Sequence, residues 1–298
     1  MSWFWFALAT PVLYCAAIYI DKFVLSKKNT DPLVVTLLSG VVLGAMALII
    51  RMVFGVNQIG GPEILALLVS GVFLLFYILP YLQALQIDEA TRVVPLMQLA
   101  PIYVLVFSTV FLGEPLTGMQ LVGFGLILAS SLVLSTDNLS LNTFKLRRSF
   151  WLMTVAMLMY AGIGLLFRYV VREQDFWTTV FYQYLGAFLA AIPLGVYMWQ
   201  KPNSKKNMVR HFPVLNFIML SNVIAGAAIL VQSLALSMTT APRVYIVEGS
   251  QPLIMLVIAV ASSIWFPKIM KEDLAGETLG KKVFFSILIF IGLLFIRN

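Results

Sequence analysis

The sequence predicts an all-α integral membrane protein in which ten transmembrane helices form two five-helix inverted repeats around a central cavity. Three observations lead to this prediction: the composition, the set of apolar segments, and short correspondences between two halves of the chain. Of the 298 residues, 61% are hydrophobic and only 11% are charged, whereas an average soluble domain carries about 25% charged residues. So few charges could not cover a water-facing surface of this size.

Ten segments qualify as membrane-spanning helices, each of which needs about 20 mostly apolar residues. The last segment is short, but Lys281 and Lys282 before it could reach the interface and extend it. The connections are too short to hold a folded soluble domain. In chain order the predicted segments are 3–20, 32–53, 62–85, 90–112, 116–136, 151–171, 177–199, 212–236, 242–266 and 283–296.

The rare residue types exclude several classes of protein. Cys15 is the single cysteine and His211 the single histidine, so the sequence offers neither a disulfide framework nor a Cys–His metal site. We find no nucleophile–base pair, HExxH pattern or P-loop pattern, and we therefore expect no enzyme, no metal, no cofactor and no direct use of ATP. A channel is disfavoured because charged rings and a filter-like loop are missing.

The positive charge indicates a membrane orientation and not a nucleic-acid partner. The net charge is +7, but the basic residues lie between the apolar segments, as they do in membrane proteins. Most of the 20 Lys and Arg residues fall in loops that follow odd-numbered segments. The positive-inside rule then places those loops in the cytoplasm and both termini outside it.

Short correspondences relate the two halves of the chain. Residues 90–93 (Ala-Thr-Arg-Val) match 241–244 (Ala-Pro-Arg-Val), and Pro101 matches Pro252 at the same offset. Five helices in each half force the second copy to insert the other way up, and such inverted repeats are associated with alternating access. The predicted parts are a first repeat (1–136), a basic connecting loop (137–150) and a more divergent second repeat (151–298).

A run of spaced residues crosses the fourth and fifth segments. It reads P…GE…Q…G…LI and consists of Pro101, Gly113, Glu114, Gln120, Gly123, Leu126 and Ile127, preceded by Ala84, Leu85 and Ala90. This run resembles the end of an EamA-type repeat of the drug/metabolite transporter superfamily, and the plan of ten helices in two halves extends the resemblance over nearly the whole chain. In the second half, residues 267–276 interrupt the pattern before Glu277.

The resemblance implies a transporter in which helices one, three, four, six, eight and nine surround a central cavity. It also implies that both termini lie in the cytoplasm, which is the opposite of the orientation that the charge distribution favours.

Glu248 is the only carboxylate in the interior of an apolar segment, where it is the seventh residue of segment 242–266. A charge near mid-membrane costs about 2.5–3.5 kcal/mol on insertion scales, so such a residue usually faces protein or a watery cavity. We interpret Glu248 as a proton-coupling carboxylate or as an anchor for a cationic group of the substrate. The alternative is a structural ion pair or a protonated, hydrogen-bonded acid. Tyr245 and Pro252 share its helix face and would line the same cavity.

Gln98 lies between Pro95 and Pro101 in the fourth segment. Prolines free backbone carbonyls, which are tolerated at membrane depth only where protein or water can satisfy them. We therefore predict that Gln98 faces the substrate and that Pro101 and Pro252 are hinges in the two halves. Ordinary kinking of membrane helices is the alternative.

Further candidates for substrate binding are polar residues on other segments. Arg92 and Arg243 occupy matching positions at helix starts, where they either attract an anionic substrate or anchor the helix ends. Glu114 is expected to cap the helix that follows it. The remaining candidates, which either contact substrate or link helices by hydrogen bonds, are Tyr81, Gln83, Tyr160, Asn222 and Gln232.

These residues predict a secondary transporter that moves a small polar metabolite, an amino acid or a related compound, by alternating access. Glu248 is the candidate for proton coupling. A flippase for a lipid-linked metabolite, using the same fold, is the alternative. The expected partners are the small-molecule substrate and membrane lipids, with no nucleic acid, and a monomer is compatible with the sequence. The expected location is a bacterial inner membrane, as a multi-pass protein.

Overall fold

The chain is helical throughout the part that the computed structural model describes, which comprises residues 2–28, 31–87, 93–134, 147–200, 215–265 and 276–297. No strand occurs in these ranges, which confirms the all-α prediction. The helices are α1 (Ser2–Lys28), α2 (Pro32–Phe54), α3 (Gly61–Phe76), α4 (Ile78–Ile87), the 3₁₀-helix η1 (Val94–Gln98), α6 (Leu99–Phe107), the π-helix η2 (Ser108–Leu112), α7 (Gly118–Leu134), α8 (Arg148–Val171), α9 (Phe176–Gln200), α11 (Leu215–Met238), α12 (Ala241–Glu248), α13 (Gln251–Trp265) and α14 (Gly276–Arg297).

Each predicted apolar segment coincides with one or more of these helices. The third segment corresponds to α3 and α4, the fourth to η1, α6 and η2, and the ninth to α12 and α13. The tenth helix is longer than its predicted range, 283–296, because α14 begins at Gly276. Its first turns contain Glu277 and Lys281, and an apolar pattern cannot detect a helix that starts in polar sequence.

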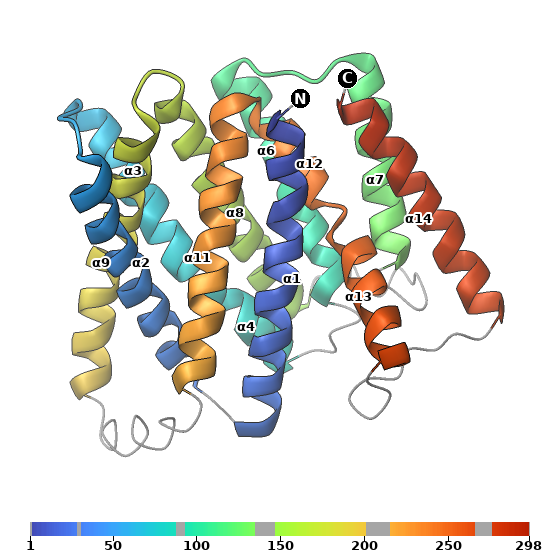
Figure 1. Ribbon diagram of the computed structural model, residues 1–298, viewed down its shortest axis with the longest axis horizontal. Coiled ribbons are helices and arrows are strands. Elements are labelled where there is room, and N and C mark those ends of the chain that lie inside the picture. Colours follow the sequence, from blue (N-terminus) through green and yellow to red (C-terminus); the bar gives the residue numbers. More distant parts are fainter. Residues whose placement is uncertain are drawn as a thin grey trace.

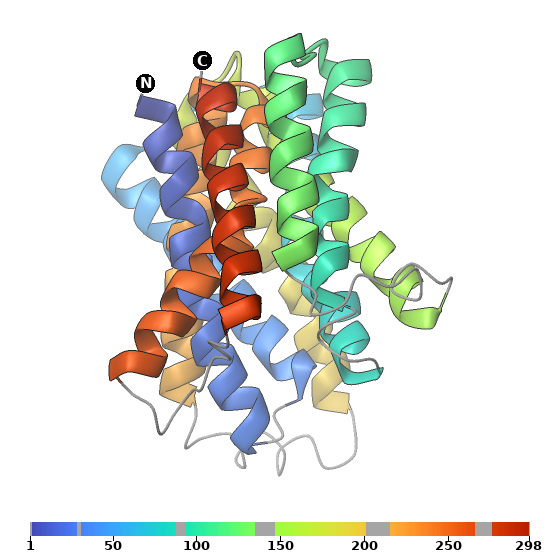
Figure 2. The same ribbon diagram turned by 90° about the vertical axis from the view of Figure 1, so that its right-hand side faces the viewer.

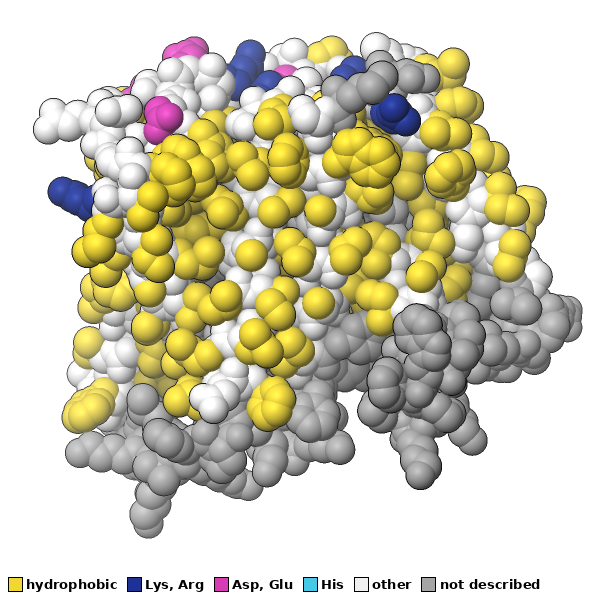
Figure 3. Space-filling model, in the orientation of Figure 1, with side chains coloured by type: hydrophobic (Ala, Val, Ile, Leu, Met, Phe, Trp, Pro, Cys, Tyr) yellow, Lys and Arg dark blue, Asp and Glu magenta, His cyan; other side chains and the backbone are white. Residues whose placement is uncertain are grey.

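The described surface is suited to lipid. By length and composition, five helices are able to cross a membrane, namely α2, the run from α3 into α4, α8, α9 and α11. Large hydrophobic side chains point outward, among them Met52, Phe111 and Trp199, which are 82%, 76% and 70% exposed. Figure 3 shows hydrophobic side chains over most of the described face, with charged side chains gathered toward one end. The described helices are those of a membrane protein.

Local sequence fixes the starts of two helices. At α2, the Asp31 carboxylate accepts a hydrogen bond from the Leu33 N–H at 3.0 Å, and Pro32 occupies the first turn. At α7, the Thr117 N–H donates to Gln120 Oε1 at 3.1 Å and the Gln120 N–H donates to Thr117 Oγ1 at 3.4 Å. Such a reciprocal pair satisfies N–H groups that a helix start would otherwise leave without partners.

Helices from the two halves of the chain pack against each other in pairs. α1 lies against α11, α2 against α9, α7 against α14, α6 against α12, and α3 with α4 against α8. Figures 1 and 2 show α7 and α14 side by side, and they place the N- and C-terminal ends at the same end of the molecule. The core therefore forms where the two halves meet.

Three helix breaks occur shortly before prolines. α3, η1 and α12 end just ahead of Pro80, Pro101 and Pro252, respectively. Proline lacks the N–H that would bond to the carbonyl four residues earlier. The carbonyls of Met97 and Glu248 therefore lose their helical partners at matching places in the two halves.

Candidate functional site

A cavity of about 180 Å³ lies between helices of both halves. Its described lining comes from α1, α2, α3, α4, η1, α6, α8, α11 and α12, and from Gln251 at the start of α13. The cavity extends from Glu248 toward the end of the molecule where α2 and α11 begin, and it reaches Val35 and Ile218 in their first turns. The two halves of the chain therefore share one binding-sized space.

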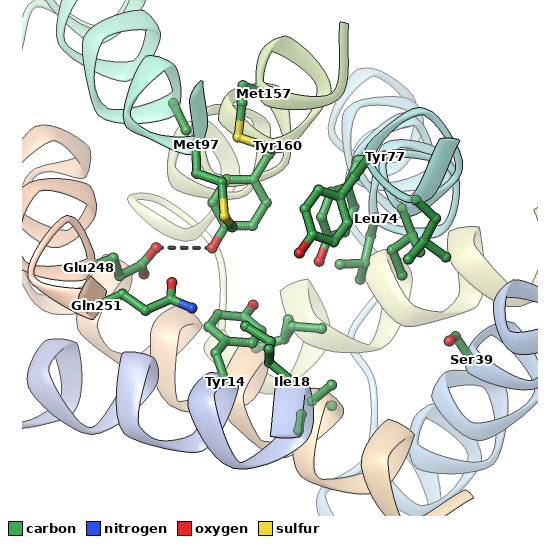
Figure 4. A pocket seen from close by; sticks show the side chains of 18 of the residues that line it. Tyr14, Ile18, Ser39, Leu74, Tyr77, Met97, Met157, Tyr160, Glu248 and Gln251 are labelled. Carbon is green, nitrogen blue, oxygen red and sulfur yellow. Dashed lines mark hydrogen bonds between the residues drawn. The ribbon is translucent and has the colours of Figure 1, made fainter. Parts of the chain in front are cut away.

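Glu248 is the last residue of α12 and is 8% exposed. Its Oε2 accepts a hydrogen bond from the Tyr160 hydroxyl at 3.0 Å, and that hydroxyl accepts one from Gln232 Nε2 at 3.2 Å. Within the described residues, Glu248 Oε1 has no hydrogen-bond partner. Figure 4 shows the carboxylate at the edge of the open space, joined to Tyr160 by the dashed line. One carboxylate oxygen is thus held in place while the other remains available.

Aromatic rings surround the same space. The Tyr160 ring centroid lies 5.3 Å from that of Tyr77 and 5.4 Å from that of Tyr245. The Tyr245 hydroxyl donates to the Tyr160 backbone carbonyl at 2.9 Å, and the Tyr245 ring packs directly on Gly164, where a larger residue would find no room. Tyr14 from α1 points into the space from the opposite side (Figure 4). Helix packing therefore fixes the positions of these rings.

The backbone break after Glu248 is held by two polar side chains. Gly249 O accepts from Ser131 Oγ at 2.6 Å and from Gln98 Nε2 at 3.4 Å. The Leu253 N–H, which would bond to this carbonyl in a continuous α-helix, bonds to Ser250 O instead. Gln98 lines the cavity, and its Oε1 finds no partner in the described part of the chain. The break thus positions Glu248 and Gln98 on one wall.

A second polar pair lies on the far side of the cavity. Ser39 Oγ of α2 donates to Asn222 Oδ1 of α11 at 2.8 Å. The Asn222 Nδ2 atom has no partner among the described residues. Figure 4 shows Ser39 well separated from Glu248, so the polar groups form two separate clusters with apolar side chains between them.

The structure brings most of the predicted site residues to this cavity. The residues that line it are Glu248, Gln98, Tyr245, Tyr81, Tyr160, Asn222 and Pro101. Gln232 is buried beside them, where it donates to Tyr160.

Other predicted residues lie elsewhere. Gln83 is exposed, because α4 turns Tyr81 and Leu82 toward the cavity. Pro252 is absent from the lining, because the break at Gly249 and Ser250 ends the helical periodicity that would have placed it on the face of Glu248.

Of the two predicted arginines, the structure describes Arg243 alone. Arg243 is half-buried and does not line the cavity. Arg92 lies outside the described residues.

The lining residues that were not predicted from the sequence include Tyr14, Ser39, Tyr77, Met97 and Gln251. The sequence does contain a signal for Tyr14 and Tyr77, since a tyrosine in the middle of an apolar segment brings a hydroxyl that needs a partner. Their positions alone do not say which face of the helix points inward.

Glu114 makes long-range contacts that its position in a turn does not predict. Its Oε1 pairs with Arg168 Nε at 2.8 Å, and its Oε2 accepts from the Ala241 N–H at 3.0 Å and from Ser108 Oγ at 3.2 Å. It therefore caps the start of α12, and the expectation that it caps the following helix is wrong, because Thr117 and Gln120 cap α7.

Arg168 extends this contact to a third helix. Its Nη1 donates to Leu236 O of α11 at 2.8 Å. The side chains of Glu114 and Arg168 are 5% and 13% exposed. The turn at 113–117 lies at the end of the molecule that also holds the two termini (Figure 1). We call these contacts among Ser108, Glu114, Arg168, Leu236 and Ala241 the Glu114 network.

Comparison with known families gives one match. A family model described as the EamA-like transporter family matches residues 1–136, which are less than half of the chain. The predicted resemblance to the drug/metabolite transporter superfamily is confirmed over these residues. Together with the five apolar helices, the match points to a multi-pass membrane protein.

Solved structures agree on the fold. A crystal structure of another protein is 15% identical to this chain, with a TM-score of 0.69 and coverage of 100% of this chain and 98% of that chain. At this identity the likeness shows the fold alone. A comparison with the curated proteins gives no significant match.

Proposed function

We propose that this protein is a secondary transporter of a small polar metabolite, that it works by alternating access in a bacterial inner membrane, and that Glu248 carries the binding or coupling step. One observation supports this most strongly. A carboxylate oxygen without a hydrogen-bond partner among the described residues lies at the edge of a cavity lined by both halves of the chain. A buried charge of this kind is costly, so it is retained where a ligand or a proton uses it.

The helix pairing supports the proposed inverted repeat. A two-fold axis in the membrane plane relates helix one to helix six and helix three to helix eight, so the contact of one with eight is repeated as the contact of six with three. In this chain these helices are α1, α8, α3 with α4, and α11. The pairs α1–α11 and α8–α3 follow this rule. Helices two and seven, four and nine, and five and ten would be mutual partners, as α2–α9, α6–α12 and α7–α14 are.

A single hydrogen bond supports the same symmetry. The Gln98 side-chain amide donates to the Gly249 backbone carbonyl, and these two residues are 151 positions apart. Pro101 and Pro252 are separated by the same offset. Two residues related by a two-fold axis touch each other only when they lie close to that axis. The proposed axis therefore passes beside Glu248, where a substrate site equally reachable from both sides belongs.

The two ends of the molecule differ in a way that suits one state of a transport cycle. The cavity extends from Glu248 toward the starts of α2 and α11. At the opposite end, the Glu114 network joins the first half to α8, α11 and α12 of the second half. We interpret this conformation as closed at the end that holds the termini, and its inverted counterpart would be closed at the other end.

The flippase alternative has less support. Pockets for drug-sized ligands measure about 300–1,000 Å³, and this cavity is about 180 Å³. The described lining contains no Lys or Arg to hold a lipid phosphate. A small soluble metabolite fits these features better than a lipid-linked one.

A transport assay with Glu248→Gln tests the proposal. The full-length protein is reconstituted in liposomes with an internal pH indicator, and uptake from a soluble bacterial metabolite extract is measured by mass spectrometry. We expect the wild type to accumulate one or a few compounds and Glu248→Gln to lose this accumulation or its proton movement, because the amide keeps the shape of the side chain but not its charge.

The matched control is Glu173→Gln, because Glu173 is exposed in the turn after α8 and its replacement should leave transport unchanged. Thermal unfolding in detergent verifies that both variants fold. If a folded Glu248→Gln protein transports like the wild type with unchanged proton movement, Glu248 has a structural role only.

A further inference from the structure

We propose that the cavity is a binding site for a small organic cation, a protonated amine attached to a short apolar body. The inference rests on the proposed transport function and narrows its substrate class. It follows from the charge of the lining, from the hydrogen-bond acceptors that face the cavity, and from the aromatic rings around them.

The described lining carries one charged side chain, and it is an acid. Among the described residues that enclose the cavity, Glu248 is the one Asp, Glu, Lys, Arg or His. Glu248 has no salt-bridge partner in the described part of the chain, and the hydrogen bond to its Oε2 comes from the Tyr160 hydroxyl. A cation would supply the missing countercharge in a site where charges are poorly solvated.

The unused hydrogen-bonding atoms near Glu248 comprise the Tyr14 hydroxyl, which can donate or accept, and two acceptor oxygens. The two oxygens are Glu248 Oε1 and Gln98 Oε1, which lack partners within the described chain. The orientation of the Gln98 amide is fixed, because its nitrogen must be the atom that donates to Gly249 O. An ammonium group has N–H donors and no acceptor, so it complements these two oxygens. A carboxylate or phosphate would repel both.

Aromatic rings provide the second element of cation recognition. Tyr14, Tyr77 and Tyr160 surround the space in front of Glu248 (Figure 4). The face of an aromatic ring attracts an ammonium group, and this attraction grows when water is excluded. Because the Tyr160 hydroxyl points at Glu248, its ring and the carboxylate meet at one place. A single cation could contact both.

The rest of the lining accommodates an apolar body. Ile18, Leu74, Met97 and Met157 line the cavity around the tyrosines. Methionine adapts to ligand shape through its flexible side chain. The Asn222 Nδ2 donor beyond them is neutral, so it suits a hydroxyl or carbonyl oxygen but does not balance a buried carboxylate. We therefore expect amines to bind and the corresponding amino acids to bind much less.

Three probes that share a phenylethyl body and differ in their charged groups test this inference. Phenethylammonium is a cation, phenylalanine adds an α-carboxylate to make a zwitterion, and 3-phenylpropionate is an anion. Binding to the purified full-length protein in detergent is measured by titration calorimetry. We expect phenethylammonium to bind at least about tenfold more tightly than phenylalanine, a tenfold ratio being a modest difference in binding free energy, and 3-phenylpropionate not to bind.

Two substitutions locate the bound cation. Tyr14→Leu removes a ring and should weaken phenethylammonium binding by up to about tenfold, while Tyr14→Phe keeps the ring face and should bind nearly as well as the wild type. The matched control is Tyr169→Leu, because Tyr169 is 52% exposed on α8 and does not line the cavity. Equal loss in Tyr14→Phe and Tyr14→Leu would contradict a role for the ring.

Counterflow in liposomes separates this inference from the transport function. Exchange of phenethylammonium and not of phenylalanine supports both. Binding of phenethylammonium without any exchange supports the cation site and contradicts transport of this probe class. Exchange or tighter binding of phenylalanine or 3-phenylpropionate leaves the transport function standing and overturns the cation site, as does the absence of phenethylammonium binding.

Discussion

The two oxygens of Glu248 have different surroundings, and this difference supports the role in transport that we propose for the side chain. Oε2 accepts the Tyr160 hydroxyl, which in turn accepts from Gln232. Oε1 has no partner in the described part of the chain. A fully satisfied carboxylate would be a structural group, whereas this one is oriented by its neighbours and keeps an acceptor for a ligand or a proton.

Tyr160→Phe tests the orientation of Glu248. The ring and its packing remain, but the hydroxyl that donates to Glu248 is lost. Hydrogen bonds between membrane helices contribute about 0.6 kcal/mol on average and at most about 1.7 kcal/mol, so the free energy of unfolding should fall only slightly. A loss of about 1.4 kcal/mol changes an equilibrium constant about tenfold. We therefore expect the initial transport rate to fall by up to about tenfold.

The measurement is initial uptake in liposomes together with detergent unfolding. Tyr169→Phe is the matched control, because Tyr169 lies on the same helix but is exposed. Wild-type uptake by Tyr160→Phe would mean that this hydrogen bond has no role in transport.

At the level of single residues, the sequence identified a residue type that is rare in an apolar segment. It did not predict which way the more common side chains point. Glu248 was found because a carboxylate inside an apolar segment is unusual. Tyr14 and Tyr77 were missed because tyrosine occurs on both lipid-facing and inward-facing helix surfaces, and tertiary packing decides between them. The partners of Glu114, such as Arg168, are distant in sequence and have no local signature.

Close contact between helices depends on glycine at a few places. Gly186 of α9 lies against the backbone of Leu68 in α3, where an added Cβ would approach the Leu68 carbonyl oxygen to 2.5 Å and its Cα to 2.7 Å. Small residues of this kind let membrane helices approach closely. The α3–α9 packing that supports the cavity wall therefore requires glycine here.

Gly186→Ala should lower the free energy of unfolding by about 1–3 kcal/mol, the usual cost of overpacking. Gly125→Ala is the matched control, because Gly125 is an exposed helical glycine with no atom within 4 Å of an added Cβ, and alanine there should be neutral or stabilising. Denaturant titration in mixed detergent compares the two. Equal effects of both substitutions would show that the crossing is not tightly packed.

The Glu114 network predicts strong coupling between Glu114 and Arg168. Removing one partner of a buried ion pair costs about 3–5 kcal/mol, because the other charge stays buried without compensation. We expect Glu114→Gln and Arg168→Gln each to be destabilising and the double variant to lose clearly less than the sum. Unfolding of the four proteins in a double-mutant cycle measures this difference. Additive losses would show that the two residues act independently.

At the level of elements, hydropathy located every helix but not its interruptions. Pro80, Pro101 and Pro252 all follow breaks, so the prolines carried the signal for split helices. Only the last two were singled out as hinges, and whether they move remains a prediction. The polar start of α14 was missed because apolar periodicity ends where a helix leaves the lipid.

For the whole molecule, the sequence offset between the halves was a better guide than composition. It predicts that Pro101 and Pro252 correspond, and the contact of Gln98 with Gly249 has the same offset. Composition and segment number could not predict which helices pair, because all apolar helices look alike before they pack. Orientation stays a prediction, with the charge distribution favouring external termini and the family resemblance favouring cytoplasmic ones.

Access to the cavity from both sides of the membrane is the most direct test of the account. Met97 lines the cavity, and the only native cysteine, Cys15, is buried. Met97→Cys in a Cys15→Ser background is reconstituted in liposomes and labelled with a membrane-impermeant thiol reagent from the outside or from the inside. We predict labelling from both sides, with Glu114→Gln raising access from the side that holds the termini and lowering it from the other. Labelling from one side only, unchanged by Glu114→Gln, would contradict alternating access.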